Sequence, residues 1–177
     1  ANNVNEIIVN DNDGTAPRKR NMGFDKATQP YVFFCDDDIL LPANYIQKLY
    51  DALLKEHKTP EIVFTYTGYH GIVLHPESHP MRGNFQIAGV PFSAQRLRQG
   101  NYISTMTLVK RDVFPRFDET LKRLQDWDIW LTLSEQGFRG KLVSDLSFYA
   151  YYLDTGITSN QNSEIDAINA LRRKHRF

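Results

Sequence analysis

At 177 residues, the chain has the length of one domain, and it is long enough to bury a substantial core. Apolar residues make up 41% and charged residues 24%, which are the proportions of a globular protein. Lys plus Arg and Asp plus Glu both number 21, and this balance argues against a dedicated nucleic-acid-binding protein. A single cysteine excludes an intrachain disulfide, and no apolar run approaches the ~20 residues of a membrane-spanning helix.

The first third of the chain predicts strands that alternate with helices. Apolar and β-branched residues favour strands over residues 4–9, 31–35 and 62–66. A short helix is expected to open at the basic cluster of residues 18–20. Apolar residues at three- and four-residue spacing predict a second helix over about 43–56. This order predicts an α/β fold with a mostly parallel sheet and helical crossovers.

The remainder of the chain mixes loops with further strands and helices. Residues 67–100 are rich in Pro and Gly, which predicts surface loops with short strands near 71–74 and 85–90. Three histidines of this segment lack the spacing of a compact metal site: His70, His75 and His79. Beyond it, the patterns predict strands at 103–109, 141–143 and 147–153 and helices that begin near residues 126 and 165.

Three consecutive carboxylates follow the apolar run of residues 31–35. We expect that run to be a strand buried on both faces, with Cys35 packed inside it. At ~6 Å separation and an effective dielectric of ~20, each pair of anions would cost on the order of 2–3 kcal/mol. A divalent cation with oxygen ligands would offset the repulsion between Asp36, Asp37 and Asp38. The alternative is a solvated loop with an Asp helix cap.

For several other charged positions the sequence allows both a functional and a purely structural interpretation. Asp11 and Asp13 lie in a polar loop after the expected strand at 4–9, where nucleotide binding and simple turn formation are equally compatible with the sequence. The basic cluster that includes Arg20 would neutralise the acidic loops or bind a phosphate, and the alternative is an exposed helix face. Asp126 lies at the start of an expected helix, where capping alone also favours a carboxylate.

Four segments resemble, in the same order, those of family 2 glycosyltransferases with the GT-A fold. They are Glu6-Ile-Ile-Val-Asn-Asp11, Arg20-Asn-Met-Gly-Phe-Asp-Lys-Ala27, Tyr31 to Pro42, and residues 103–131 with Phe117-Asp-Glu119 and Gln125-Asp126-Trp127. In turn they resemble the family's base-contacting strand end, its Arg-Asn-x-Gly helix start, its Asp-x-Asp strand end and its acidic pair ahead of a Trp-bearing helix. Any one motif is weak, whereas four in the family's order form a strong match.

The resemblance implies one GT-A-like α/β domain over residues 1–177, with a mixed, mostly parallel sheet flanked by helices. A Rossmann-like nucleotide-binding half would occupy about 1–66, and an acceptor-side half about 67–177. The family normally begins with a strand and a helix that have no counterpart in this sequence. We therefore expect either a fragment truncated at its N-terminus or a nucleotide pocket that lacks one wall.

The resemblance also implies roles for individual residues. Asp36 would approach the donor ribose, and Asp38 together with Asp36 would bind Mn²⁺ or Mg²⁺ at the donor diphosphate. Asp126 would be the general base that removes the proton of the acceptor hydroxyl, which gives inversion at the anomeric carbon. The remaining positions expected to bind the donor are Asp11, Asp13, Arg20 and Asp37.

The expected activity is metal-dependent transfer of one sugar from a nucleotide-diphosphate sugar, with UDP favoured, to a sugar or glycolipid acceptor. This transfer would be a step in the synthesis of surface polysaccharides or glycoconjugates. No Gln-x-x-Arg-Trp follows Asp126, which argues against a processive synthase. A cytoplasmic location is expected. Peripheral attachment to the inner face of the membrane is left open, because the basic residues 172–176 would suit either an anionic membrane or a solvated helix end.

Two other functions are retained beside the transferase. A truncated or non-catalytic module that binds sugar nucleotides or glycans is supported by the missing first strand and by Gln125, which replaces the family's usual Glu. A nucleotidyltransferase, which would share a related sheet and a carboxylate-bound metal, is the less favoured of the two.

Overall fold

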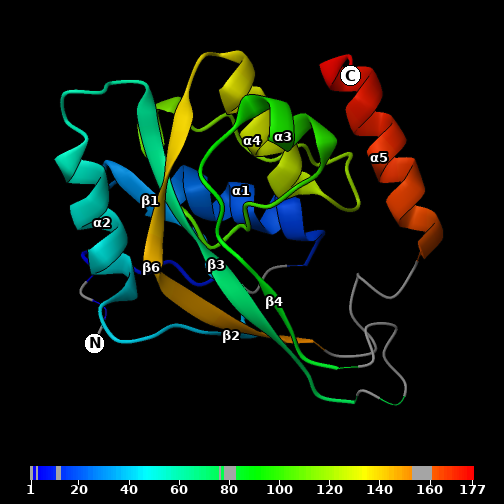
Figure 1. Cartoon of the computed structure of the whole chain (residues 1–177), viewed down its shortest axis with the longest axis horizontal. Coiled ribbons are helices and arrows are strands. Elements are labelled where there is room, and N and C mark those ends of the chain that lie inside the picture. Colours follow the sequence, from blue (N-terminus) through cyan, green and yellow to red (C-terminus); the bar gives the residue numbers. More distant parts are fainter. Residues whose placement is uncertain (1, 3, 11–12, 76, 78–82, 153–160) are drawn as a thin grey trace.

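The computed structural model describes residues 2, 4–10, 13–75, 77, 83–152 and 161–177, and every structural statement below concerns them. They form one sheet of six strands, in the order β1-β5-β3-β6-β2, with β4 paired to β3 (Figure 1). The strands are β1 (Tyr31–Phe33), β2 (Ile39–Leu40), β3 (Ile62–Val73), β4 (Phe85–Ile87), β5 (Leu108–Lys110) and β6 (Arg139–Tyr152). All neighbouring pairs are antiparallel except β3 and β6.

Helices cover both faces of this sheet, and each face has its own core. The helices are α1 (Ala16–Lys26), α2 (Tyr45–Lys55), α3 (Ala94–Gln99), the 3₁₀ turn η1 (Arg111–Val113), α4 (Gln125–Glu135) and α5 (Gln161–His175). One face packs on α2 through its fully buried stripe Tyr45, Leu49 and Leu53. The other face packs on α1, α3 and α4, and α5 lies outside α4 (Figure 1).

The helices at 43–56, near 126 and near 165 are confirmed, and so is the short strand expected near residues 85–90. The apolar spacing of α2 produces the stripe that the sheet buries. At the end of α4, Gly137 has a φ of 85°, a left-handed conformation that stops a helix at little steric cost in glycine. No helix among the described residues is both long and apolar enough to cross a membrane.

The strand expected at residues 4–9 is wrong. Residues 4–10 form no strand, and the side chains of Ile7 and Val9 keep 78% and 81% of their surface exposed. A strand is stabilised by hydrogen bonds to a neighbouring strand. Within the described sheet, β1 is an edge strand whose one partner is β5, yet residues 4–10 form no ladder with its other edge.

The mostly parallel sheet is also wrong, although the α/β class is confirmed. β1 and β3 do run in the same direction, as a crossover through α2 requires. However, β5 lies between them and is antiparallel to both, so they are not neighbours. The single parallel pair in the described sheet is β3 with β6.

Six predicted strands have other bounds. The run at 31–35 is not buried on both faces, because β1 ends at Phe33, only its Val32 is buried, and Cys35 is exposed. The segments 62–66 and 71–74 form the single strand β3, and 141–143 and 147–153 combine in β6, with a register change between them. Residues 103–107 are not a strand, since the Thr107 hydroxyl donates to the Ser104 carbonyl at 2.8 Å and closes a turn.

Candidate active site

The carboxylates after β1 face an arginine from α1. Arg20 Nη2 lies 2.6 Å from Asp36 Oδ1, and its guanidinium lies 5.4 Å from the centre of the Phe117 ring. Both side chains of the pair are partly buried, at 19% and 35% exposure, so the ion pair is less screened than a surface pair. Arg20 therefore neutralises part of the negative charge that the three consecutive carboxylates create.

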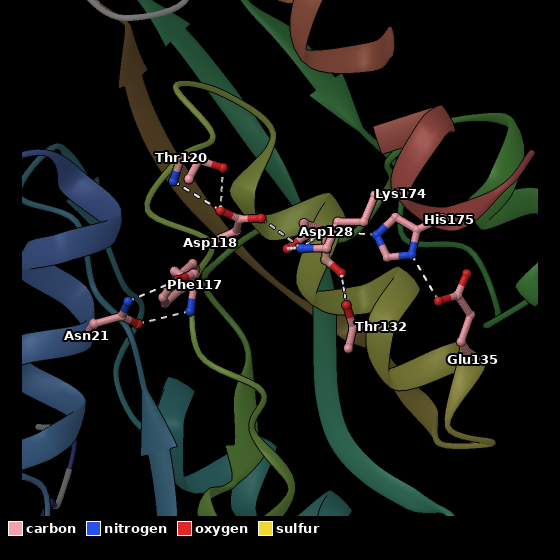
Figure 2. A network of polar contacts seen from close by, with 9 residues as sticks. All are labelled: Asn21, Phe117, Asp118, Thr120, Asp128, Thr132, Glu135, Lys174 and His175. Atoms are coloured by element: carbon pink, nitrogen blue, oxygen red, sulfur yellow. Dashed lines mark hydrogen bonds and ion pairs between the residues drawn. The ribbon is translucent and has the colours of Figure 1, made fainter. Parts of the chain in front are cut away.

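The neighbouring Asn21 explains how α1 is held in place. Its amide is buried, and it donates to the Phe117 carbonyl and accepts from the Phe117 N–H, both at 2.9 Å (Figure 2). The same Nδ2 also lies 2.9 Å from Glu119 Oε1. The Arg-Asn motif and the Phe-Asp-Glu motif are thus in direct contact through hydrogen bonds of Asn21. Asn21 fixes the helix, which leaves Arg20 directed at Asp36.

Asp38 lies near two other carboxylates, and their negative charge disfavours its ionised form. Partial burial, and then the charges of Asp36 and Asp37, raise its pKa, and Arg20 opposes that rise. Its backbone carbonyl accepts from the Tyr151 N–H at 2.9 Å, which ties the loop to β6. Asp37 is exposed. A cation placed near Asp38 would relieve the repulsion that raises its pKa.

Asp126 lies in the first turn of α4 and is held by two hydrogen bonds. Its Oδ1 accepts from the Trp127 N–H at 2.9 Å, and its Oδ2 accepts from Asn101 Nδ2 at 2.8 Å. Burial raises the pKa of Asp126, while these two donors and the charge of Arg20 act in the opposite direction. A carboxylate with a raised pKa is suited to removing a proton near neutral pH.

Asn101 is a site residue that the sequence did not reveal. Its Oδ1 accepts from the Ile103 N–H at 3.2 Å, so its NH₂ group is the part that faces Asp126. It follows Gly100, which ends α3, and a lone Asn after a Gly is an ordinary loop residue. Only the tertiary contact gives it a role.

A buried ionic network anchors α4 beneath this carboxylate. Asp128, at 2% exposure, lies 2.9 Å from Lys174 Nζ and 2.8 Å from His175 Nε2, both on α5 (Figure 2). The other ring nitrogen of His175 lies 2.9 Å from Glu135 Oε2. Both ring nitrogens of His175 thus face carboxylate oxygens, one on Asp128 and one on Glu135. Lys174 Nζ also lies 2.9 Å from Asp118 Oδ2. Helix α5 therefore joins α4 to the loop after η1, whose Phe117 is hydrogen-bonded to Asn21.

The model of the family described as "Glycosyl transferase family 2" matches residues 3–117, which is more than half of the chain. The chain belongs to this family. Arg20 and Asp36 to Asp38 lie inside the matched part, whereas Asp126 lies beyond it. The GT-A fold fits the mixed α/β structure of this glycosyltransferase. No curated protein matched the chain.

Asp13, His70 and His75 of the glycosyltransferase take no part in the contacts described above. Asp13 is exposed in the turn before α1, and Asp11 lies outside the described residues. His70 stacks on Tyr149 with ring centres 5.1 Å apart, and His75 lies 3.8 Å from Glu77. His79 lies outside the described residues.

Gln125 has a structural role in the glycosyltransferase. Its amide is buried and donates to the Leu121 carbonyl at 3.0 Å. An ionised Glu at this position would have no proton to donate to that carbonyl. The preceding Leu124 has a φ of 59°, a left-handed conformation that costs on the order of 1 kcal/mol or more in a residue with a branched side chain. Backbone strain thus lies directly before the turn that carries Asp126.

Proposed function

We propose that the glycosyltransferase moves one sugar from a nucleotide-diphosphate sugar to an acceptor hydroxyl in a metal-dependent, inverting reaction. The observation that carries this proposal is the position of Arg20. It pairs with Asp36 at 2.6 Å, and its charge opposes the rise in the pKa of both Asp38 and Asp126. The carboxylates after β1 and the carboxylate of α4 would therefore share one site, although about 90 residues separate them in the chain.

The donor side would consist of the carboxylates after β1. Asp36 would contact the ribose, and Asp38 with Asp36 would bind Mn²⁺ or Mg²⁺, for which carboxylate oxygens are suitable ligands. The described residues contain no group of three or more His, Cys, Asp or Glu side chains placed to hold a metal ion. The protein would thus supply one or two ligands, and the donor diphosphate others. When bound, the cation would stabilise the charge of the departing nucleoside diphosphate.

The acceptor side would consist of Asp126 and the groups that hold it. Asp126 would take the proton of the acceptor hydroxyl while the oxygen attacks the anomeric carbon, opposite to the bond that breaks to the diphosphate. Attack from that side inverts the anomeric configuration. Asn101 and the Trp127 N–H would keep the carboxylate in one orientation, and the raised pKa of Asp126 would strengthen it as a base.

The substrates proposed are a UDP-sugar donor and a sugar or glycolipid acceptor in surface polysaccharide or glycoconjugate synthesis. Arg20 is placed to help neutralise the diphosphate once the donor displaces its pairing with Asp36. The basic end of α5, with the exposed Arg172 and Arg173, would allow the protein to rest on the inner face of an anionic membrane.

Three variants test this proposal. Calorimetry should detect UDP binding that depends on Mn²⁺, and Asp38→Asn should abolish that dependence. Asp126→Asn should leave UDP binding unchanged and lower sugar transfer at least about 100-fold, which is the usual contribution of a general base. Asp51→Asn, an exposed carboxylate on α2, is the matched control and should change neither. NMR of the product should show an inverted anomeric configuration.

Transfer that persists in Asp126→Asn would contradict the role of the base. UDP binding without any transfer by the wild-type protein would favour the non-catalytic binding module instead. Release of pyrophosphate from a nucleoside triphosphate and a sugar phosphate would favour a nucleotidyltransferase.

A further inference from the structure

Three aromatic side chains form a partly exposed corner at the end of the sheet where β4 pairs with β3. They are Tyr69 of β3, Phe85 of β4 and Tyr152, the last residue of β6. The two tyrosine hydroxyls lie 3.3 Å apart, and the Phe85 ring centre lies 5.1 Å from that of Tyr152 and 6.2 Å from that of Tyr69. All three side chains are only partly buried, so the corner combines apolar ring surface with two adjacent hydroxyls.

The corner is held rigidly by what lies beneath it. The Tyr69 ring stacks on the buried Phe148 ring at 5.2 Å and an interplanar angle of 14°. Phe85 is opposite Gly71 in the β3–β4 ladder, and a Cβ added at Gly71 would lie 2.3 Å from the Phe85 ring. A glycine at position 71 therefore leaves the space that the Phe85 ring occupies. Fixed side chains of this kind lose little entropy when a ligand binds.

The corner is joined to the carboxylate loop that follows β1. The Tyr151 N–H donates to the Asp38 carbonyl at 2.9 Å. Tyr152 is the next residue, so it adjoins a residue that is hydrogen-bonded to the carboxylate loop. Burial, and with it the charge of Asp126, raises the pKa of Tyr69 and of Tyr152, and Asp38 adds to this effect at Tyr152. Both hydroxyls therefore keep their protons at neutral pH and can donate as well as accept.

A pyranose ring has the chemistry that this corner would recognise. Its hydroxyls need partners that both donate and accept, and its C–H groups need apolar surface. Tyr69 also lines a cavity of about 280 Å³ with polar residues of β4 and β6, including Gln86, Asp145 and Ser147. The space beside the corner is thus polar and large enough for a further sugar unit.

We propose that Tyr69, Phe85 and Tyr152 form the subsite that binds the acceptor saccharide, with the cavity beside Tyr69 receiving the rest of the acceptor. This inference rests on the proposed function, because it takes Asp126 as the base that acts on the acceptor. It assigns the two hydroxyls to hydrogen bonds with the acceptor and the Phe85 ring to its apolar face.

Saturation-transfer NMR with methyl glycosides of glucose, galactose and N-acetylglucosamine tests the subsite directly, and calorimetry with UDP and Mn²⁺ monitors the donor side. At least one glycoside should bind the wild-type protein. Tyr69→Phe and Tyr152→Phe should each weaken that binding about 3- to 10-fold, as expected for one lost hydrogen bond, without changing UDP binding. Tyr31→Phe, on the same face of the sheet but packed on Tyr50, is the matched control and should bind as the wild type does.

Three results would overturn the subsite. They are no binding of any of these glycosides to the wild-type protein, unchanged binding in the double variant of Tyr69 and Tyr152, and a loss of UDP affinity in the tyrosine variants. Failure of the proposed function is a separate result. If UDP does not bind and no sugar is transferred, but glycoside binding depends on the two tyrosines, the saccharide site stands and the transferase proposal fails.

Discussion

The pKa of Asp126 results from opposing effects of the groups around it. Burial favours the neutral acid, whereas the Trp127 N–H, the Asn101 amide and the Arg20 charge favour the ionised form. The pKa of Asp126 remains raised because burial has the larger effect. The activity of the base at a given pH should therefore depend on each of the weaker opposing groups.

The first prediction concerns Asn101→Ala. Its amide stabilises the ionised form of Asp126, so its removal should raise the pKa of that carboxylate further. A hydrogen bond to a charged group contributes about 1.5 kcal/mol or more, which corresponds to about one pH unit. Because the base must be ionised to act, the acidic limb of the kcat/KM profile for sugar transfer should move upward by about that amount.

Gln47→Ala is the control for this experiment. Gln47 donates to Asp51 at 2.8 Å on the exposed surface of α2, the same kind of amide–carboxylate bond at a distance from the site. Its loss should leave the pH profile unchanged. An acidic limb that stays in place in Asn101→Ala would show that the amide does not tune the base.

At the scale of elements, α5 is held to the rest of the protein by charge and by apolar packing. Asp128 is almost fully buried and contacts Lys174 and His175, while Ala167 and Leu171 of α5 are buried. Breaking a buried ion pair by removing one partner is costly, because the remaining charge stays out of water. The position of α4, and with it Asp126, therefore depends on a helix about 40 residues later in the chain.

The second prediction concerns Asp128→Asn, which keeps the size of the side chain but removes the negative charge that the ammonium of Lys174 and the ring of His175 both contact. The free energy of unfolding should fall by about 3 kcal/mol, the lower end of the range for a broken buried pair, since Lys174 is partly exposed. Urea unfolding measures the loss, and hydrogen exchange should show faster exchange in α5. Asp166→Asn, an exposed carboxylate on α5, should change neither quantity.

The third prediction concerns the pH dependence of Asp118. Desolvation acts to raise its pKa, but hydrogen bonds from Thr120 and Lys174 outweigh this and lower it from 3.8 to about 2. A lowered folded-state pKa adds stability above the unfolded-state pKa, and that stability is lost as pH falls from about 4 to about 2. Asp118→Asn should therefore cost about 1 kcal/mol at pH 7 after solvent screening is allowed for.

Urea unfolding at two pH values checks this sign. The difference between Asp118→Asn and the wild type should be present at pH 7 and should shrink as the pH approaches the folded-state pKa of about 2. A difference that grows on acidification would contradict the assignment, because it would mean that the ionised form of Asp118 destabilises the folded protein.

At the scale of the whole molecule, the long pair of β3 and β6 joins the two cores. Both strands contribute residues to the core under α2 and to the core under α4. Near the start of β6, Gly140 lies opposite Phe64, and an added Cβ would lie 2.1 Å from the Phe64 ring. Phe64 is completely buried and has no free space to move into.

The fourth prediction compares two alanine substitutions of glycine. Gly140→Ala should lower the free energy of unfolding by about 1–3 kcal/mol, because it overpacks the core. Gly23→Ala, in α1 where an added Cβ meets nothing within 4 Å, should instead raise it by about 0.5–1 kcal/mol through helix propensity. Urea unfolding measures both, and shifts of the same sign in the two variants would contradict the packing at Gly140.

The sequence by itself determined the features that depend on near neighbours in the chain. The apolar spacing of α2, the Gly137 stop of α4 and the carboxylates after the apolar run of β1 were all readable, because each depends on a few consecutive residues. The family motifs likewise identified Arg20 and Asp36, which the structure places 2.6 Å apart. The roles proposed for Asp38, Asp126 and the metal ion stay predictions.

Only the tertiary structure decided the features that depend on distant partners. Residues 4–9 have the composition of a strand, yet they form none, and they make no ladder with the edge strand β1 or with any other described strand. β5 lies between β1 and β3, and this placement makes the sheet mostly antiparallel. Asn101 gains its role from Asp126, 25 residues further on, and Asn21 from Phe117, 96 residues further on. Local sequence specifies which backbone conformations are low in free energy. Strand pairing and buried hydrogen bonds depend instead on which groups the whole fold brings together.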